Sequence, residues 1–302
     1  MPVKKKDKSQ ETENLKTAVA EESAELEISK ESFQEVEDLL KSEGISLITE
    51  EDELFLKQTA KTVEAAAALT EPVVFFYTVG VDSKDKVVFI KSRLMLNDKF
   101  LGKMIPEHYV SCAETASRIE ELNLVEVEEV ASKCNELKDY LFVTTVSVRN
   151  LLKAEATKKL IKIGATENKN LMLSFDAPTL AVVGELGIKG IKELKEAGFK
   201  IMLENLENAP IKVLSQYDIN FARLDFRFYK QRTADQFAQA QAVISLCKSR
   251  GISVSCAYIK HLGEAQYMLN QGADTAEGYA FGEPKRSALS AVEERRYLTA
   301  IK

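Results

Sequence analysis

The sequence is poor in the residues that bind zinc or act as thiol nucleophiles, with two histidines and four cysteines in 302 residues. No two cysteines form a C-x-x-C pair, so a structural zinc site is not expected. We interpret the thiols as reduced core residues of a cytoplasmic protein. A nucleophilic Cys–His pair is the less favoured interpretation, because buried cysteine usually behaves as a small hydrophobe. The residues concerned are Cys112, Cys134, Cys247, Cys256, His108 and His261.

Long apolar runs are also missing. No stretch of about 18 apolar residues is present, so no membrane span is expected. The basic residues after Met1 are not followed by an apolar segment, which argues against a secretory signal. The chain is 45% hydrophobic and 29% charged, a composition that allows a sizeable core.

The net charge of −6 is unevenly distributed. Residues 1–71 carry 18 acidic and 9 basic side chains, whereas residues 72–302 carry 29 acidic and 32 basic ones. Within the first part, residues 31–71 hold 11 acidic side chains against 3 basic ones. The overall acidity argues against non-specific nucleic-acid binding, and the asymmetry indicates two parts with different roles.

The N-terminal part is predicted to be a tail followed by an acidic arm. Residues 1–30 are rich in charge and poor in large apolar side chains, so we expect a flexible charged tail. Residues 31–72 predict a helical arm of two helices, the second capped by Thr49 and ended before Pro72. The arm either packs on the main domain, which we favour, or offers a partner or dimerisation surface. The apolar positions of its two helices are Phe33, Val36, Leu39 and Leu40, then Leu56, Ala60, Val63 and Ala67.

From residue 73 onward, strands and helices alternate. Two β-branched and aromatic runs, at 73–79 and 86–96, are separated by a turn and predict a hairpin. A long helical stretch is expected from about 106 to 138, followed by six more strands, each separated from the next by helix. Eight strands in about 230 residues predict an α/β fold, a (β/α)8 TIM-like barrel with an antiparallel first strand. Glycine ends three of the helices, at Gly198, Gly251 and Gly272.

Several segments near the C-terminus resemble one family. Gly278-Tyr-Ala-Phe-Gly-Glu-Pro284 is similar to Q-G-Y-x-F-x-x-P, residues 251–260 to G-L-x-V-V-A-E-G-V-E, and residues 220–228 to D-x-L-K-I-D-x-S-F. In order and spacing, residues 73–286 resemble the EAL family, the bacterial cyclic di-GMP phosphodiesterases. The resemblance implies an EAL-type barrel over residues 73–290, with a C-terminal tail or helix over 291–302. The leading antiparallel strand of that family explains the predicted hairpin.

Active members of the family use two metal ions, held by carboxylates and one Asn at the carboxyl ends of the strands. Oxygen donors suit hard divalent cations, and two metals stabilise the attacking and leaving oxygens. The aligned positions of this sequence depart from that pattern. The E-A-L segment reads Lys91, Ser92 and Arg93, and the phosphate-binding Arg after it is Met95. Thr145 replaces the Asn ligand, and Ser174 replaces the Glu of L-x-L-E. Glu204 and Asn205 stand at the positions of the paired acids of D-D-F-G. Arg223 stands at the position of the catalytic Lys, beside a retained Asp225. Ala257 and Lys260 replace the two Glu of E-G-V-E, and Glu277 replaces the final Gln.

These replacements predict no phosphodiesterase activity, no metal and no cofactor. An Arg is a poor substitute for a catalytic Lys because its guanidinium does not titrate usefully. The charges left at the mouth of the barrel allow two interpretations. In the first, Lys91, Arg93, Arg223 and Lys260 form a basic pocket for an anion, and in a specific version of it the acidic arm of the same chain covers the pocket. In the second, these residues form internal ion pairs with Glu204 and Asp225. We favour the ion pairs.

Two further segments have simple interpretations. The acidic residues of the helix over 118–138 are expected on a solvated face; they are Glu120, Glu121, Glu126, Glu128 and Glu129. The aromatic and basic segment Phe226–Arg232 is expected to pack on the barrel rather than to contact nucleic acid.

Taken together, the sequence predicts a catalytically inactive EAL-like protein that serves as a protein-interaction, scaffold or regulatory module. The resemblance implies a bacterial motility or envelope-associated complex, with a protein partner bound through the barrel surface or the N-terminal helices. Homo-oligomer formation is a further option. The alternative functions are a metal-independent receptor for cyclic di-GMP or another nucleotide, and an enzyme with a rebuilt site on the same barrel.

Overall fold

The structure is a computed structural model and describes most of the chain beyond residue 49. The predicted tail over 1–30 and the first predicted helix of the arm lie outside the described part. Among the described helices, none is long and apolar enough to cross a membrane. The described residues are 50–70, 73–164, 170–227 and 234–300.

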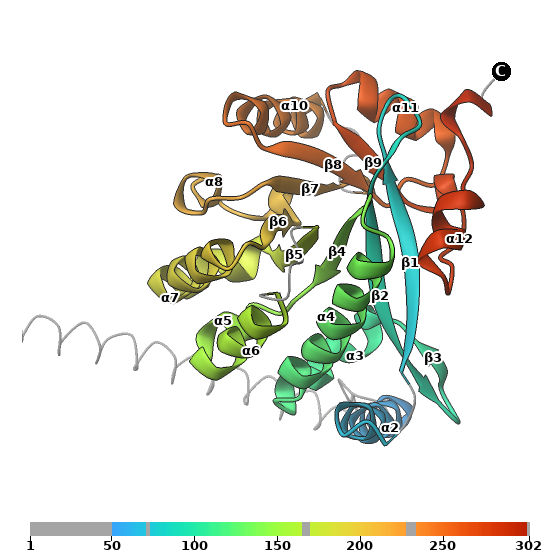
Figure 1. Ribbon diagram of the computed structural model, residues 1–302, viewed down its shortest axis with the longest axis vertical. Coiled ribbons are helices and arrows are strands. Elements are labelled where there is room, and N and C mark those ends of the chain that lie inside the picture. Colours follow the sequence, from blue (N-terminus) through green and yellow to red (C-terminus); the bar gives the residue numbers. More distant parts are fainter. Residues whose placement is uncertain (1–49, 71–72, 165–169, 228–233, 301–302) are drawn as a thin grey trace, which may run out of the picture. The chain divides into compact units, whose positions relative to one another are not determined.

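Eight strands close into a barrel (Figure 1). Neighbouring strands from β2 through β9 pair in parallel around the barrel, and β1 pairs antiparallel with both β2 and β9, which closes the ring. The predicted TIM-like barrel with an antiparallel first strand is therefore confirmed. The barrel strands are β1 (Val74–Val81), β2 (Val87–Asp98), β4 (Leu141–Thr145), β5 (Leu171–Asp176), β6 (Lys200–Glu204), β7 (Phe221–Asp225), β8 (Ser253–Ala257) and β9 (Thr275–Glu277).

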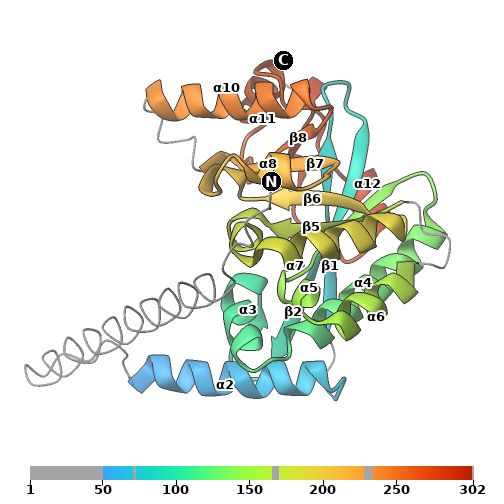
Figure 2. The same ribbon diagram turned by 90° about the vertical axis from the view of Figure 1, so that its left-hand side faces the viewer.

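Helices connect the strands and lie outside the sheet (Figures 1 and 2). The glycines expected to end helices take up the left-handed conformation, with φ of 100° at Gly198, 71° at Gly251 and 106° at Gly272. After β2, the helices are α3 (Pro106–Thr115), α4 (Ile119–Glu136), α5 (Arg149–Leu152), α6 (Ala154–Gly164), α7 (Ala177–Glu196), α8 (Val213–Gln216), α10 (Ala234–Ser249), α11 (Leu262–Asn270) and α12 (Ala288–Glu293).

Three local predictions were wrong. The long helix expected from 106 to 138 is two helices, α3 and α4, because Ser117 has a φ of 55° and interrupts the helical backbone. A short strand, β3 (Gly102–Met104), extends β2 as a hairpin that the sequence analysis missed. The last strand was expected over 275–281, but it ends at Glu277, and Tyr279–Phe281 forms a 3-10 turn instead.

The C-terminal residues pack near the β1–β2 turn. Helix α12 contacts β1 and β2, and it spans the position at which the sequence analysis placed the end of the barrel. Asp85 in the β1–β2 turn accepts a hydrogen bond from the backbone N–H of Leu298 at 2.6 Å, and its carbonyl accepts one from Arg295 at 2.9 Å. These contacts tie the segment after α12 to the hairpin.

The interior of the barrel is built in layers. Phe89, Val143, Met172 and Met202 form a buried apolar cluster that fills its lower part, and Phe221 packs against them. Side chains in a strand alternate between the two faces with a period of two, so the inward residues of the next layer lie two positions further along. That next layer is polar and forms the floor of the candidate site.

Helix α2 (Glu50–Ala67) adds a second small core. From Gln58 onward, its buried positions are Thr59, Thr62, Val63 and Ala66, and partly buried Ala67 packs against the same cluster. The predicted stripe of Leu56, Ala60, Val63 and Ala67 is therefore correct at Val63 and Ala67 and otherwise shifted. Leu56 is exposed. Val63 and Ala66 join a cluster contributed by β2, β3, α3 and α4, with members such as Leu94, Leu96, Met104 and Tyr109.

Asp98, at the end of β2, anchors this part of α2. Its carboxylate accepts hydrogen bonds from Thr62 Oγ1 at 2.6 Å and Gln58 Nε2 at 2.7 Å. The backbone N–H groups of Phe100 and Leu101 donate to it at 2.7 and 2.6 Å. Burial raises the pKa of Asp98, but the hydrogen bonds from Thr62, Leu101 and Gln58 outweigh burial and hold that pKa well below its usual value.

We predict that Asp98→Ala lowers the free energy of unfolding by about 2–3 kcal/mol, because it leaves buried donors without an acceptor. The pKa of Asp98 is lower in the folded state than in the unfolded state. Asp98 therefore stabilises the fold above its ordinary pKa of 3.8, and this stabilisation is lost as the pH falls below that value. Urea unfolding measures the loss, and amide exchange within residues 58–67 should accelerate. Asp82→Ala, at the solvent-facing β1–β2 turn, is the control; an equal loss there would contradict the anchoring role.

Candidate functional site

The floor of the candidate site is a layer of polar side chains, one from each barrel strand. Apart from Lys91, which lies in the middle of β2, the members on the parallel strands lie at or near the carboxyl ends, where barrel enzymes place their active sites. In the four strands that carry the apolar cluster, the polar member follows two residues after its apolar counterpart. We call the set the polar layer; it consists of Thr78, Lys91, Thr145, Ser174, Glu204, Arg223, Ser255 and Glu277.

Glu204 is the centre of the polar layer. Lys91 Nζ and Ser174 Oγ both donate to its Oε1, and Thr145 Oγ1 donates to the same oxygen at 2.9 Å. Arg223 Nη1 donates to Oε2 at 2.9 Å. The side chains of Lys91, Glu204 and Arg223 are each no more than 12% exposed, so these ion pairs are largely shielded from water.

Arg223 extends the network to the last strand. Its Nε donates to Glu277 Oε1 at 2.6 Å, and Ser255 Oγ donates to the same oxygen at 3.3 Å. The guanidinium lies 4.9 Å from the ring of Tyr258, a residue that holds a positive φ of 60° just after β8. Arg223 therefore bridges two carboxylates under an aromatic ring, a geometry that its planar fork of donors suits.

The charges of the polar layer stabilise one another. Burial alone would raise the pKa of Glu204, but Lys91 and Arg223 outweigh burial and hold that pKa well below its usual value. Burial would lower the pKa of Arg223, and the carboxylates of Glu277 and Glu204 raise it instead. Both groups are therefore charged at neutral pH. Lys91 and Arg223 therefore form internal ion pairs, as the favoured interpretation of the sequence expected.

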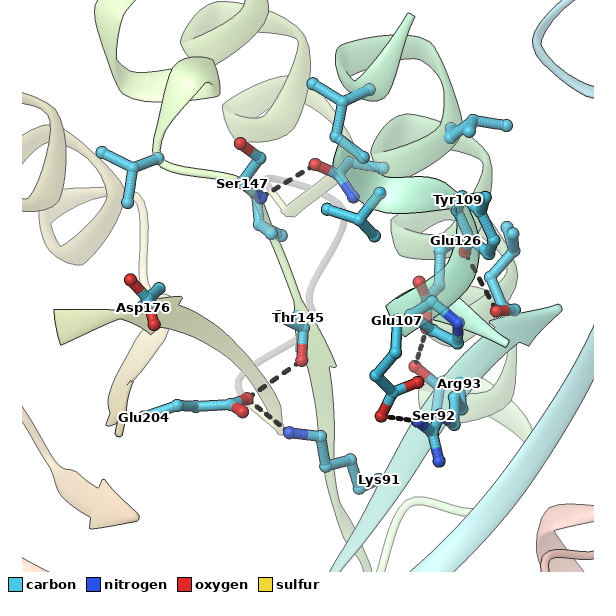
Figure 3. Close-up of a pocket in the computed structure, with 18 of the residues that line it drawn as sticks. Lys91, Ser92, Arg93, Glu107, Tyr109, Glu126, Thr145, Ser147, Asp176 and Glu204 are labelled. Carbon is cyan, nitrogen blue, oxygen red and sulfur yellow. Dashed lines mark hydrogen bonds and ion pairs between the residues drawn. The ribbon is translucent and has the colours of Figure 1, made fainter. Parts of the chain in front are cut away.

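A cavity of about 380 Å³ lies above the polar layer (Figure 3). The strands supply one side of its wall, with Thr145, Asp176 and Glu204, and the helices α3 and α4 supply the other, with Glu107, Tyr109 and Glu126. Part of the lining is apolar and comes mainly from the second core and the end of β4: Leu94, Pro106, Val110, Ile119, Leu122, Val146 and Val148.

Glu126 was expected on a solvated helix face, and that prediction was wrong. The residue is 7% exposed, and its Oε1 accepts a hydrogen bond from Ser92 Oγ at 2.7 Å. Burial raises the pKa of Glu126 above its usual value, against the opposing effect of the Ser92 hydrogen bond. Glu120 on the same helix is also buried and pairs with Lys153 at 2.6 Å.

The lining of the cavity is acidic rather than basic. It contains three basic side chains, and each is paired: Lys91 with Glu204, Arg93 with Glu107, and Arg223 with Glu204 and Glu277. The acidic lining residues are Glu107, Glu114, Glu126, Asp176, Glu204 and Glu277. An excess of carboxylates argues against the predicted basic pocket for an anion, and equally against a cover formed by the acidic arm.

The remaining predicted positions lie outside this network. Asp225 makes a bidentate pair with exposed Arg227 instead of pairing with Lys91, and Lys260 is exposed in the loop after β8. Asn205 donates to Asp176 at 2.8 Å. Met95 and Ala257 are buried and carry no polar group. Residues that the sequence analysis did not single out are Thr78, Glu107, Glu114, Asp176, Ser255 and Tyr258.

The two-metal centre of active EAL enzymes does not fit these residues. In the described part of the chain, no group of three or more His, Cys, Asp or Glu side chains is arranged to hold a metal ion. The ammonium of Lys91 binds the one acidic residue of the layer, Glu204, that aligns with a metal-binding position. Two divalent cations placed beside Lys91 and Arg223 would meet strong like-charge repulsion.

The thiols offer no alternative nucleophile. All four cysteines are free, and burial raises the pKa of Cys134 to about 12 and of Cys247 to about 11. Because the thiolate is the reactive form, these groups are unreactive at neutral pH. Of the segment Phe226–Arg232, Phe226 is buried in the core as expected, and residues from 228 onward lie outside the described part.

The EAL domain family model matches residues 67–284, more than two thirds of the chain. This chain belongs to the EAL domain family. The PaMucR phosphodiesterase in complex with cyclic di-GMP is similar in structure, with a TM-score of 0.70 and 14% identity over 76% of this chain and 97% of that one. The EAL domain of FimX from Pseudomonas aeruginosa, bound to cyclic di-GMP, has a TM-score of 0.69 and 10% identity over the same shares.

An EAL domain protein from Listeria monocytogenes EGD-e shows a TM-score of 0.64 and 15% identity over 76% of this chain and 93% of that one. No curated protein matches the sequence. At such low identity, these structures establish the shared EAL fold, while the site must be interpreted from the residues of this chain.

We predict that Glu204→Gln lowers the free energy of unfolding by about 3 kcal/mol or more, because it leaves Lys91 and Arg223 buried with fewer compensating charges. The depressed pKa means that Glu204 contributes stability above its ordinary pKa of 4.5 and loses it as the pH falls, so the variant should show a shallower acid dependence. Asp225→Asn is the matched control, since its partner Arg227 is exposed. Equal costs for the two variants, measured by urea unfolding from neutral to acid pH, would refute the central role of Glu204.

Proposed function

We propose that this EAL domain is catalytically inactive and acts as a protein-interaction or regulatory module. The observation that carries the proposal is the ion-pair network of Lys91, Glu204, Arg223 and Glu277, which occupies the place where the chemistry of the family needs free oxygen ligands. Glu204 is committed to Lys91 and Arg223 and is therefore a poor ligand for a metal that would activate water, and Arg223 is a poor general base because its pKa is raised.

Exposed apolar side chains favour an interaction role. Leu54 and Leu56 on α2 are 69% and 49% exposed, and Val182 and Leu186 on α7 are 83% and 58% exposed. These four side chains are the candidate contact positions for a partner, since contiguous exposed apolar surface marks interaction sites. The partner is a protein, in the setting of a bacterial motility or envelope-associated complex, and a second copy of the chain is another candidate.

A metal-independent receptor for cyclic di-GMP is the second candidate function. The cavity at the barrel mouth favours it, and the PaMucR and FimX structures contain that nucleotide. The acidic lining counts against it, because the nucleotide carries two phosphates that would face unneutralised carboxylates. We therefore rank the receptor below the interaction module.

We expect no hydrolysis of cyclic di-GMP with magnesium or manganese, and no binding tighter than about 100 μM by calorimetry, which corresponds to about 5.5 kcal/mol. The reason is the loss of metal ligands together with the acidic cavity. An active EAL phosphodiesterase serves as the positive control. Binding at or below micromolar concentration would overturn the interaction proposal in its simple form and support the receptor.

Pull-down from the native cell tests the partner surfaces. We expect the pair Leu54→Asp and Leu56→Asp, or Val182→Asp on α7, to reduce recovery of the partner about tenfold or more, because a charge in an apolar contact is desolvated without compensation. Point variants of the full chain are preferable to truncation at residue 72, since Val63 and Ala66 belong to the core. If both sets leave recovery and the oligomeric state unchanged, neither helix is the surface.

A further inference from the structure

We propose that the cavity above the polar layer binds a small organic amine, with its apolar body against α3 and α4 and its ammonium among the carboxylates of the lining. This inference goes beyond the proposed function and does not depend on it. It rests on the shape, the charge and the hydrogen-bonding character of one cavity, all contributed by described residues.

The size and the apolar wall suit a small-molecule body. A volume of about 380 Å³ lies within the range of small-ligand sites, about 300–1,000 Å³. Leu94, Ile119 and Leu122 are fixed in the second core and face the cavity together with Val110 and Val146. An alkyl or aromatic group placed against these side chains would leave water, which is the main favourable contribution to binding of this kind.

The charge of the lining selects a cation. Two of its carboxylates, Glu114 and Asp176, have no cationic partner in the described part of the chain. Each is held by neutral donors instead, Glu114 by Ser147 Oγ at 2.6 Å and Asp176 by Thr179 and Asn205. Glu126 contributes less negative charge, because burial raises its pKa. A positive ligand would gain Coulomb energy from these groups, whereas an anion would be repelled.

The hydrogen-bonding groups of the lining also favour a ligand that donates hydrogen bonds. Ionised carboxylates only accept hydrogen bonds, and the hydroxyl of Tyr109 already donates to the carbonyl of Leu94 at 3.0 Å. The side-chain oxygen of Asn123, the amide of the lining, already accepts hydrogen bonds from the backbone N–H of Ser147 and from Asn150 Nδ2. An ammonium has three donors and no acceptor, so it complements this wall better than a carboxylate or phosphate does.

The test is calorimetric titration of the full chain at neutral pH and low salt with three probes that share one ring. They are 2-phenylethylamine, 2-phenylethanol and 3-phenylpropanoate. We expect the amine to bind about tenfold or more tightly than the alcohol, and the carboxylate to bind most weakly. Equal affinity for the amine and the carboxylate, or no binding of the amine at millimolar concentration, overturns the proposal.

Variants locate the site. Glu114→Gln and Asp176→Asn should each weaken the amine about fivefold to twentyfold and leave the alcohol nearly unchanged. Glu128→Gln is the matched control, since Glu128 is an exposed carboxylate outside the lining of this cavity. Val110→Phe fills the cavity and should weaken both the amine and the alcohol, with thermal melting to show that the variant folds. Amine binding that survives Val110→Phe, or that falls equally in Glu128→Gln, overturns the assignment to this cavity.

Discussion

The arrangement of the barrel mouth depends on the charge pairing between Glu204 and the two cations that flank it. A buried carboxylate without compensation costs several kcal/mol, and so does a buried guanidinium. Lys91 comes from β2, Glu204 from β6 and Arg223 from β7, so one set of ion pairs connects strands that are far apart in sequence. Mutual compensation explains why three ionised side chains can stand directly above a purely apolar layer.

The same constraint explains why the metal chemistry of the family does not fit. In an EAL phosphodiesterase, divalent cations would neutralise the acids at the strand ends. In this chain the neutralising charges are covalently part of β2 and β7, and hydroxyls of Thr145 and Ser174 complete the shell of Glu204. A fixed cation cannot deliver an activated water molecule, and this difference is the basis of the proposed loss of catalysis on a retained fold.

Local patterns predicted the architecture well. The β-branched runs, the glycines that end helices and the short β1–β2 turn correctly indicated eight strands with an antiparallel first strand. The break at Ser117 was missed because a single left-handed residue outside glycine has no strong sequence signal. The shift of the α2 stripe follows from Asp98, which binds the polar side chains of Thr62 and Gln58 and so turns a partly polar face inward.

The site was only partly predictable. Alternation with a period of two identifies Lys91, Glu204 and Arg223 as inward residues, but it does not apply beyond the strands, and Lys260 in the loop after β8 points away from the network. Asp225 was misassigned because Arg227, two residues later, captures it locally. Glu126 did carry a signal, since it shares a helical face with Leu122, Asn123 and Val130, all of them buried. Because Glu126 is charged, the sequence analysis assigned it to the solvated face in spite of that pattern.

Strand β2 joins the two parts of the molecule that carry its distinctive chemistry. Lys91 and Arg93 pair with acids at the cavity, Ser92 bonds Glu126, and Asp98 at the far end holds α2 from Gln58 onward. Strand β1 pairs with β2 as far as Met95 and β3 pairs with it from Leu96 to Asp98, so a continuous ladder connects Lys91 with Asp98. A ligand that changes the ion pairs of Lys91 and Arg93 would therefore act on the same element that positions α2. A ligand that selects between two arrangements of β2 would therefore couple occupancy of the cavity to the hydrogen bonds that Asp98 makes with Gln58 and Thr62.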